Sequence, residues 1–592
     1  IGGDITADTS LTATISYLLT SQLFVKDGVT LSIPAGTTVY ALPPPAASTM
    51  APSVVIEQGG KIMAEGTATA PITMTSILAE SALDSATTIE TDTASGGSIT
   101  LGARGKWGGL IINGKAPITG GTDTVEGLTN VPYGGTDPAD SSGVLRYVRV
   151  WHGGAVVGEN NEINGVTFGG VGSGTVVDHC EVAFNKDDGF EFFGGTVNVK
   201  YLSVLFVGDD SFDTDEGYQG KGQFLFTMLG EQGNHGTEMD SKYDNQPRSH
   251  PQFYGMTIVG SGSSGRQSAG MRLREGTGGK FGNVVMANLG GVHSGVENKQ
   301  CTDGGAATSL VSTQDLSSVD ASDLNSHLFF SSNNIIHEAS TAFVYESPCT
   351  NLGWTAVTSD PMLMVGAGTE SNDIPIDPRP ACGSPAYSDV DSVPDAFFTD
   401  VSFKGAFGED NWLDGWSILE YVSTPLDCSA TYDPISLCGD ITSDLTLYKG
   451  TMYIMSCQVF VKAGVTLAIV PGATIYSTPT GPDGKAPALV IEQGAYILAE
   501  GTEDLPITFT ALNPEEVSTE TAQTDTDATS GVTTLEDMFL GARSFNQSLN
   551  DWDISSVTDM SWMFQDASAF NKPLDAWNVA SVTAMDGMFK NA

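Results

Sequence analysis

The sequence predicts an all-β protein: a right-handed parallel β-helix body, a duplicated β-rich cap module and a short tail of 25-residue leucine-rich-type repeats. Glycine makes up 70 of the 592 residues, and long stretches alternate Val, Ile or Thr with turn-forming residues. This alternation is typical of short strands joined by tight turns. Two short repeat periods and one long duplication indicate stacked, repeated units.

Acidic residues dominate the charge, because 71 Asp and Glu against 25 Lys and Arg give a formal net charge of −46. Nucleic acid and anionic lipid bind clusters of Lys and Arg, and the sequence contains no such cluster. No run of about 18 apolar residues is present to cross a bilayer. We therefore expect no nucleic-acid partner and no membrane insertion, whereas divalent cations and neutral glycans remain plausible partners, and polyuronate would be repelled.

A module of about 75 residues occurs twice. Residues 3–6 (GDIT) recur 436 positions later as residues 439–442, and residues 55–59 (VIEQG) recur 435 positions later as residues 490–494. Both copies contain short alternating runs broken by Gly and Pro, which predict strands and turns. We expect the first cap module at 1–100 and the second at 438–511, with linkers at 422–437 and 512–532.

Residues 101–421 are expected to form the β-helix body, because a 22-residue period lies within them. Each coil of a parallel β-helix stacks on the next, so residues one period apart occupy equivalent positions. Six positions are followed 22 residues later by a residue of the same kind: Cys180, Val182, Phe184, Asp187, Asp188 and Phe190 precede Leu202, Val204, Phe206, Asp209, Asp210 and Phe212.

Residues 533–592 contain the sharpest repeat, with a period of 25 residues. The pair Met538-Phe539 recurs as Met563-Phe564 and Met588-Phe589, and Trp552 recurs as Trp577. Repeat arrays bury a continuous core only by stacking neighbouring units. The segment covers barely two periods, so we expect an incomplete repeat array whose open end is covered either by further chain or by another surface.

Two parts of the chain resemble known families. Residues 1 to about 420 resemble a family of secreted, mostly uncharacterised bacterial-type β-helix proteins, which implies a secreted or surface solenoid and transfers no catalytic residue. The matching segments are 105–114 (GKWGGLIING), 133–135 (YGG), 170–175 (GVGSGT), 192–196 (FFGGT), 405–408 (GAFG) and 411–416 (NWLDGW). Residues 535–592 resemble BspA-type leucine-rich repeats, a module associated with adhesion. The second cap module departs from the first family's pattern, because the Trp107 segment does not follow it.

Acidic pairs lie one period apart in the body, so their carboxylates should stack at roughly 4.8 Å. Like charges at that distance repel, and a cation, backbone N–H donors or a raised pKa must compensate. Oxygen clusters of this kind suit Ca²⁺, the one cofactor expected, although no EF-hand pattern is present. The alternative is a solvated or backbone-bonded acidic corner. The candidate ligands are Asp187, Asp188, Asp209, Asp210, Asp213 and Asp215.

The same region permits an enzymatic alternative. Glycoside hydrolases built on β-helices place several Asp on adjacent coils, with a His and a basic residue beyond them. Here the order of residues resembles a polygalacturonase-type site, in which two carboxylates would act as acid and base. The candidates are Asp188, Asp209, Asp210, His235, Arg272 and Arg274.

The module duplication helps to sort the seven cysteines into a local pair, a buried thiol and four others. Cys438 and Cys457 occupy the positions of Gly2 and Ser21 in the first module, so they predict one local disulfide. Cys180 aligns with an inward position and is expected to be a buried free thiol. Four cysteines remain, with three possible connectivities: Cys301, Cys349, Cys382 and Cys428.

The absence of an initiator Met predicts either a processed mature protein or a fragment. The expected disulfides favour a protein that is secreted or displayed at the cell surface. Asn546 opens an N-x-S/T glycosylation sequence inside the repeat array.

The function predicted from these features is structural rather than enzymatic. The second module lacks a body of its own, so we expect it to bind the matching surface of another copy, giving head-to-tail extracellular filaments. The alternatives are a monomeric cell-surface adhesin and the glycoside hydrolase above. The residues expected at the filament contact are Val459, Val461, Val465, Leu467, Ile469, Ile475 and Val490.

Overall fold

The computed structural model forms two compact units. Unit 1 comprises residues 1–361, 367–380 and 384–425, and unit 2 comprises residues 362–366, 381–383 and 426–592. Among the described residues, no helix is long and apolar enough to cross a membrane. The structure describes residues 1–44, 50–77, 103–125, 127–128, 130–155, 163–241, 246–262, 266–300, 302–303, 306–307, 328–347, 349, 351–364, 377–418, 426, 435–447, 453–470, 472–478, 486–499, 501, 506–511, 534–543, 545–546, 549–550, 552 and 554–591.

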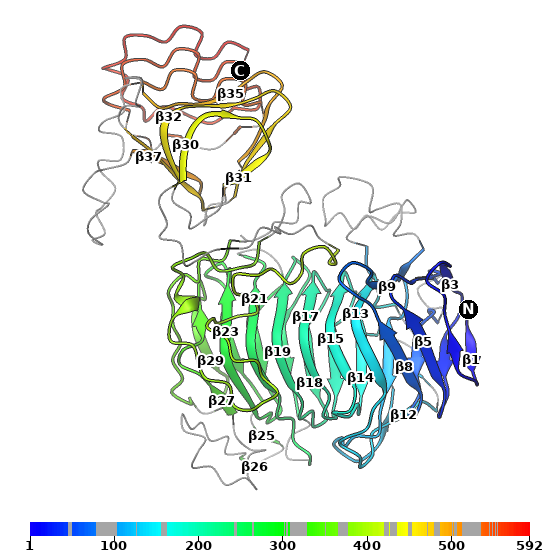
Figure 1. The fold of residues 1–592 in the computed structure, drawn as a ribbon. Helices are drawn as coiled ribbons and strands as arrows, with labels where there is room; N and C mark the ends of the chain where they lie inside the picture. Colours follow the sequence, from blue (N-terminus) through cyan, green and yellow to red (C-terminus); the bar gives the residue numbers. More distant parts are fainter. Residues whose placement is uncertain are drawn as a thin grey trace. The chain divides into compact units, whose positions relative to one another are not determined.

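Unit 1 is a parallel β-helix, as the 22-residue period predicts (Figure 1). Each coil contributes one strand to an 11-stranded sheet, here called sheet A, and one or two strands to a 14-stranded sheet, called sheet B. Sheet A contains β1 (Gly3–Ile5), β4 (Leu23–Val25), β7 (Val54–Ile56), β10 (Leu110–Asn113), β14 (Val166–Gly169), β16 (Phe190–Phe193), β18 (Phe212–Asp215), β20 (His235–Met239), β22 (Ala269–Leu273), β24 (Ser294–Asn298) and β29 (Thr341–Tyr345).

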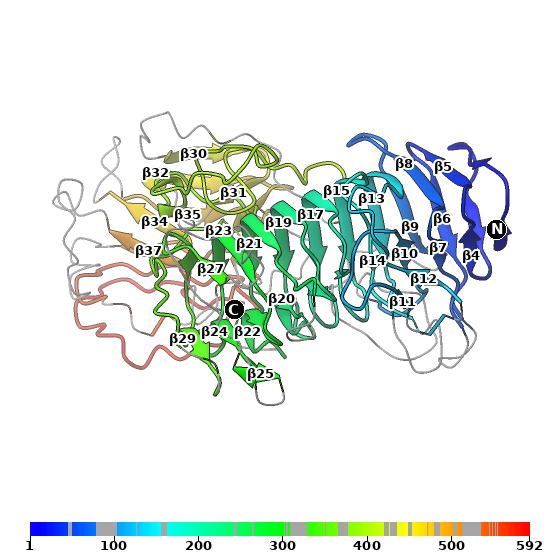
Figure 2. The same cartoon turned by 90° about the horizontal axis from the view of Figure 1, so that it is seen from below.

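Sheet B runs alongside sheet A through the same coils (Figure 2). Its strands are β2 (Thr9–Ser10), β3 (Tyr17–Leu19), β5 (Thr30–Pro34), β6 (Thr38–Ala41), β8 (Lys61–Glu65), β9 (Ile72–Ser76), β13 (Gly143–Trp151), β15 (Val176–Ala183), β17 (Asn198–Leu205), β19 (Lys221–Met228), β21 (Gln252–Val259), β23 (Gly279–Ala287), β27 (Leu328–Phe330) and β28 (Ile335–Ile336). Two short antiparallel hairpins, β11 (Asp123–Thr124) with β12 (Pro132–Tyr133) and β25 (Thr302–Asp303) with β26 (Ala306–Ala307), and the 3₁₀ turn η4 (Pro385–Tyr387) complete unit 1.

The core lies between the sheets and is built from stacked side chains. Phe190 and Phe212 pair across β16 and β18 with ring centroids 6.0 Å apart, and Phe168 stacks on Phe192 at 5.2 Å. Cys180 pairs with Leu202 at the next coil, as predicted, and is a buried free thiol whose pKa burial raises to about 12. Equivalent apolar residues therefore stack at the predicted spacing.

Each long strand of sheet B bends at a residue with positive φ. In β13 this residue is Tyr147, with a φ of 49°, and the strand pairs with β8 before the bend and with β9 after it. His179, Tyr201 and Phe224 occupy the bends of the next three strands, and the four rings stack with centroids 4.3–4.7 Å apart. Non-glycine residues with positive φ are strained, and here the aromatic stack offsets that strain.

The outer face of sheet B is covered by residues 389–418, here called the strap. Gln223 of β19 exchanges two hydrogen bonds of 2.7 Å with the backbone of Thr399, and Asn283 of β23 does the same with Asp391 at 2.8 and 2.9 Å. Trp416, which is 1% exposed, packs edge-on against Tyr147. Sheet B is thereby closed to ligands along the strap, and the outer face of sheet A is the one left for function.

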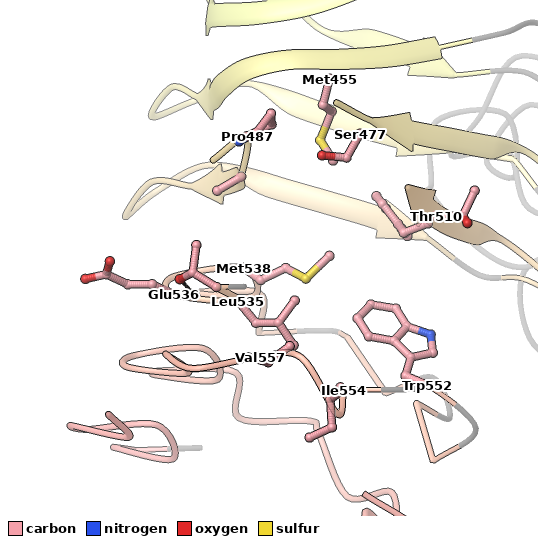
Figure 3. A pocket seen from close by; sticks show the side chains of 13 residues that line it. Met455, Ser477, Pro487, Thr510, Leu535, Glu536, Met538, Trp552, Ile554 and Val557 are labelled. Atoms are coloured by element: carbon pink, nitrogen blue, oxygen red, sulfur yellow. Dashed lines mark hydrogen bonds between the residues drawn. The ribbon is translucent and has the colours of Figure 1, made fainter. Parts of the chain in front are cut away.

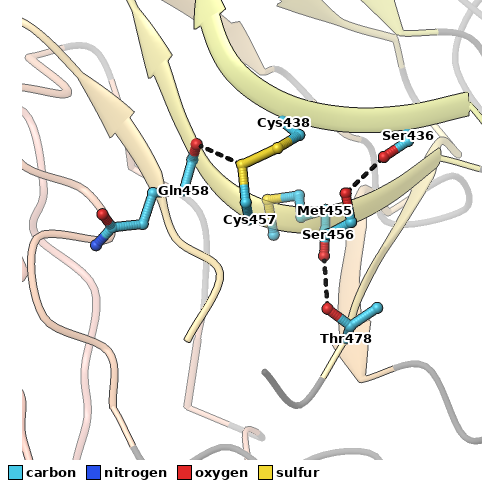
Figure 4. The surroundings of a disulfide bond; sticks show 7 residues. All are labelled: Ser436, Cys438, Met455, Ser456, Cys457, Gln458 and Thr478. Atoms are coloured by element: carbon cyan, nitrogen blue, oxygen red, sulfur yellow. Dashed lines mark hydrogen bonds between the residues drawn. A yellow bond between two sulfur atoms is a disulfide. The ribbon is translucent and has the colours of Figure 1, made fainter. Parts of the chain in front are cut away.

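Unit 2 contains the second cap module, which is a short β-helix of its own. Its strands are β30 (Ile435–Ile441), β31 (Leu445–Leu447), β32 (Tyr453–Val461), β33 (Thr466–Ile469), β34 (Thr474–Ser477), β35 (Leu489–Ile491), β36 (Tyr496–Ala499) and β37 (Thr508–Ala511), and all pair in parallel. The predicted Cys438–Cys457 disulfide joins the first two coils, with the Cα atoms 4.9 Å apart (Figure 4).

The residues expected at a filament contact lie inside this module. All seven are 8% exposed or less. Val459 and Val461 pair with Leu489 and Ile491, whereas Val490 pairs with Phe460 on the opposite face of the strand. The strands that carry them are paired: β32 contacts β30, β34 and β35, and β34 contacts β37. These side chains are therefore buried within unit 2, and the filament contact stays a prediction.

The 25-residue repeats stack as predicted and cover the module's last coils. Phe564 lies between Phe539 and Phe589, with ring centroids 5.4 Å apart on either side. Within unit 2, Met538 and Trp552 of the repeats face Met455 of the module across a cavity of about 60 Å³ (Figure 3). The repeats therefore lie beside the module within unit 2.

Candidate functional site

The outer face of sheet A carries a column of charged side chains, because strands alternate inward and outward residues. Glu191 lies between the inward Phe190 and Phe192, and the parallel register places it opposite Asp213 of β18. The same register continues along the column through Glu238, Arg272 and Glu297 on β20, β22 and β24. Five adjacent coils therefore present four carboxylates and one guanidinium in a row.

A cleft of about 270 Å³ lies over the acidic end of this column. The β11–β12 hairpin forms one wall, where the Tyr133 hydroxyl donates a 2.8 Å hydrogen bond to Glu216. Six carboxylates and one guanidinium line the cleft, together with apolar and amide groups: Val125, Tyr133, Ile163, Asn164, Thr167, Asp187, Asp188, Glu191, Phe193, Asp213, Asp215, Asp240 and Arg274.

Two groups of three carboxylates in or beside this cleft are close enough to share one ion. Oxygen atoms of Asp188, Glu191 and Asp213 lie within 4.8 Å of one another, and so do those of Asp187, Asp188 and Asp209. Asp213 is 9% exposed, and within the described residues its Oδ1 atom has no hydrogen-bond partner. Because buried polar atoms are rarely left unpaired, this oxygen is a candidate ligand for a cation.

The electrostatics of the cleft agree with this geometry. Burial raises the pKa values of Asp188, Glu191 and Asp213 well above their usual range, and the neighbouring carboxylates raise them further. Burial raises the pKa of Asp240 to about 7, against the opposing effect of Arg274. The carboxylates must therefore hold protons or share a cation.

The structure brings together most of the predicted metal ligands. Asp187, Asp188 and Asp209 form one of the groups above, while Asp213 and Asp215 line the cleft. Asp210 lies apart from the cleft lining: its Oδ1 atom is 2.6 Å from His235 Nδ1, and its backbone N–H donates a 2.9 Å hydrogen bond to Asp188.

Sequence reasoning missed two carboxylates of the cleft. Glu191 could have been found, because Asp213 follows it by the same 22 residues that relate the acidic pairs. Asp240 follows β20, and the coil that leads to β20 is longer than the preceding one, so the short period does not reach it. The hairpin that forms the wall, including Tyr133, leaves the solenoid altogether and has no periodic signal.

The basic residues beside the cleft are tied to carboxylates. Arg274 Nη2 lies 2.6 Å from both Glu238 and Asp240, and Arg272 contacts Glu238 at 3.3 Å and Glu297 at 3.2 Å. His235 is fully buried, with Nδ1 at Asp210 and Nε2 2.8 Å from the Ser268 hydroxyl oxygen. The residues proposed for a hydrolase are thus neighbours, but His235 and Asp210 are closed off from solvent.

Comparison of the sequence with known protein families also identifies a β-helix. A pectate-lyase-like β-helix domain matches residues 3–88, 95–355 and 439–521. The chain belongs to this family. The third matched range is the second cap module, so the duplication is a duplication of family sequence. No curated protein and no solved structure gives a match.

The tail matches a second family. Residues 509–592 match a family described as a mycoplasma protein of unknown function, DUF285. The comparisons give no match to BspA-type leucine-rich repeats, so that resemblance and the associated role in adhesion stay predictions. The 25-residue period that prompted the expectation is real, but a stacking period does not specify one repeat family.

The structure describes some of the remaining cysteines and part of the glycosylation sequence. Cys349 and Cys382 are disulfide-bonded, whereas Cys301 and Cys428 lie outside the described residues. Asn546 is exposed, and its side-chain oxygen accepts a 2.8 Å hydrogen bond from the backbone N–H of Asn571. The other two residues of the glycosylation sequence are outside the described residues, so glycosylation stays a prediction.

Proposed function

We propose that the β-helix body is an extracellular polysaccharide-binding protein whose acidic cleft holds a divalent cation and uses it to bind an anionic glycan. The observation that carries the proposal is the buried, unpartnered oxygen of Asp213 beside two further carboxylates. An ion at that position would satisfy this oxygen and neutralise the mutual repulsion of Asp188, Glu191 and Asp213.

The donor set favours Ca²⁺. Oxygen donors surround the position, and Ca²⁺ takes six to eight oxygen ligands, which protein carboxylates and ligand carboxylates can share. The net charge of −46 would repel an acidic glycan approaching a cation-free cleft. A bound cation lowers that local negative charge and offers the glycan a positive ligand site, and Arg274 supplies a positive group in the cleft lining.

The geometry favours binding over glycosidic cleavage. A hydrolase of the expected type needs an acid and a base that both touch the sugar. His235 and Asp210 are 0% and 3% exposed, and the two arginines are committed to ion pairs with Glu238, Asp240 and Glu297. Disulfide-bonded cysteines support the extracellular location.

Self-association is a separate prediction. Its seven expected contact residues are buried within unit 2, so a second copy would have to use another surface, such as the first strand β30, which stands at the end of its sheet. Negative-stain microscopy tests this directly, because fibres would support self-association and single particles would contradict it.

The experiment for the cleft is calorimetric titration of the chelator-treated protein, first with Ca²⁺ and then with polygalacturonate. We expect one Ca²⁺ site and glycan binding that requires Ca²⁺. Asp213→Asn should abolish both, while the control Asp400→Asn, at an exposed position, should leave both intact. Glycan binding in chelator, or unchanged Ca²⁺ binding by Asp213→Asn, would contradict the proposal.

A further inference from the structure

A second polar constellation lies beyond the acidic cleft on the same edge of sheet A. The parallel register places the position of His235, at the start of β20, opposite that of Asp210, which precedes β18, and opposite Ala269 of β22. Ser268 directly precedes Ala269. The topology therefore brings a serine, a histidine and an aspartate from three neighbouring coils to one corner of the solenoid.

These three side chains form a continuous hydrogen-bonded chain. His235 Nδ1 lies 2.6 Å from Asp210 Oδ1, and His235 Nε2 lies 2.8 Å from Ser268 Oγ. With the carboxylate accepting from Nδ1–H, the lone pair of Nε2 faces the serine hydroxyl. This is the arrangement in which an imidazole removes a proton from a serine nucleophile, and it occurs on unrelated folds.

The surroundings hold Asp210, His235 and Ser268 in place and expose only Ser268, which must contact a substrate. His235 and Asp210 are buried, whereas Ser268 is partly exposed. The backbone carbonyl of Ser268 accepts hydrogen bonds of 3.0 and 3.1 Å from the Ser294 backbone N–H and hydroxyl. The nucleophile therefore stands at the surface on a held backbone, with its base protected behind it.

A positive group is aimed at the same serine. Arg272 Nη2 lies 2.9 Å from Ser268 Oγ, and Glu238 and Glu297 hold the guanidinium from either side. A fixed cationic donor beside a nucleophilic oxygen can stabilise the negative charge that develops when that oxygen attacks a carbonyl.

We propose that Ser268 and His235 are the nucleophile and general base of a serine esterase site, positioned by Asp210. Ser268 Oγ attacks the ester carbonyl while its proton passes to His235 Nε2, and Arg272 stabilises the tetrahedral oxyanion. Collapse of this tetrahedral intermediate breaks the C–O bond to the alcohol. The alcohol takes the proton from His235 and leaves. Water, deprotonated by His235, then attacks the acyl-serine and releases the carboxylic acid, restoring the serine hydroxyl.

The substrate class follows from the location. Only Ser268 and Arg272 of this constellation reach the outer face, so the acyl carbonyl must project from a ligand lying along sheet A. An O-acylated polysaccharide fits, and this part of the inference rests on the proposed function of the cleft. The esterase chemistry itself does not, because the triad shares no side chain with the Asp188, Glu191 and Asp213 group.

The test uses the full chain, with p-nitrophenyl acetate as the ester and a fluorophosphonate probe for covalent labelling. We expect turnover in chelator, and peptide mass spectrometry should locate the label on Ser268. Ser268→Ala should lower turnover by at least about 100-fold and abolish labelling. Ser340→Ala is the matched control, because Ser340 lies at the equivalent position before β29 and donates to the backbone of His293 rather than to a histidine ring. Ser340→Ala should change neither ester turnover nor labelling.

Asp210→Asn tests the positioning role, and it should lower kcat for the same ester while KM stays unchanged. Absence of labelling and turnover in the folded parent protein would overturn the proposal. Turnover that survives in Ser268→Ala, or that needs Ca²⁺ and disappears in Asp213→Asn, would also overturn it. Loss of glycan binding with intact ester turnover would remove the proposed function and leave the esterase site standing.

Discussion

One pair of backbone positions takes different residues in the two cap modules. In the second module it holds Cys438 and Cys457, which form a disulfide, and in the first it holds Gly2 and Ser21. A Cβ atom on Gly2 would lie 2.2 Å from Ser21 Oγ, so the two positions adjoin in the first module as they do in the second. The two modules therefore share the backbone arrangement at this corner, and only the residue types decide whether a disulfide forms.

The double variant Gly2→Cys/Ser21→Cys should therefore form a disulfide in unit 1. Closing a loop of this length stabilises by about 3 kcal/mol in the chain-entropy model. We expect a higher Tm than that of the parent protein, reversed by reductant. The single variant Ser21→Cys is the control and should give a free thiol without stabilisation. Two free thiols in the double variant under oxidising conditions would show that the modules differ at this corner.

At the scale of elements, carboxylates on β16 and β18, before β16 and after β20 make the stability of the body depend on pH. Asp188, Glu191, Asp213 and Asp240 have raised pKa values in the folded state, so the folded protein holds their protons more tightly than the unfolded chain does. Their contribution to stability is complete below about pH 4. It is lost as the pH rises through the folded pKa values, which is about 7 for Asp240.

In chelator, the body should therefore be less stable at pH 8 than at pH 5. Each carboxyl group that is protonated in the folded state and ionised in the unfolded state costs about 1.4 kcal/mol per pH unit. Ca²⁺ should raise the Tm more at pH 8 than at pH 5, because the ion replaces the lost protons. Thermal melts at both pH values measure this. Asp213→Asn should flatten the pH dependence, and equal stability at both pH values would contradict the assignment.

The elements were predictable to different degrees for physical reasons. The 22-residue period aligned Cys180 with Leu202 correctly, because equal coil lengths keep equivalent residues in register. The strap was not predictable, because the contact of Arg149 with the Trp416 carbonyl joins residues 267 positions apart. Ser268 escaped notice for a related reason: the coils before β20 and β22 differ in length, so no fixed spacing relates Asp210, His235 and Ser268.

At the scale of the whole molecule, the chain consists of two units with separate cores. The Cys438–Cys457 disulfide belongs to unit 2, and the buried Cys180 thiol belongs to unit 1. A residue that stabilises one core has no direct means of stabilising the other. The two units should therefore respond to these cysteines independently.

Differential scanning calorimetry should resolve two transitions. Cys438→Ala/Cys457→Ala should lower one of them, by about 3 kcal/mol in free energy, and leave the other in place. Cys180→Ala is the complementary variant, and its small cavity in the body should lower the other transition only. A common shift of both transitions by either variant would mean that the units unfold as one.

The strap also bears on synthesis of the chain. Coils of a solenoid can stack as soon as each one leaves the ribosome, because each contacts only its neighbours. The rings of Tyr147, His179 and Tyr201, however, receive their outer cover from Trp412 and Trp416, more than 200 residues later in the sequence. At 5–20 residues per second, the nascent body would display an uncovered aromatic stripe for roughly ten seconds or longer. During that interval it is a natural substrate for a chaperone.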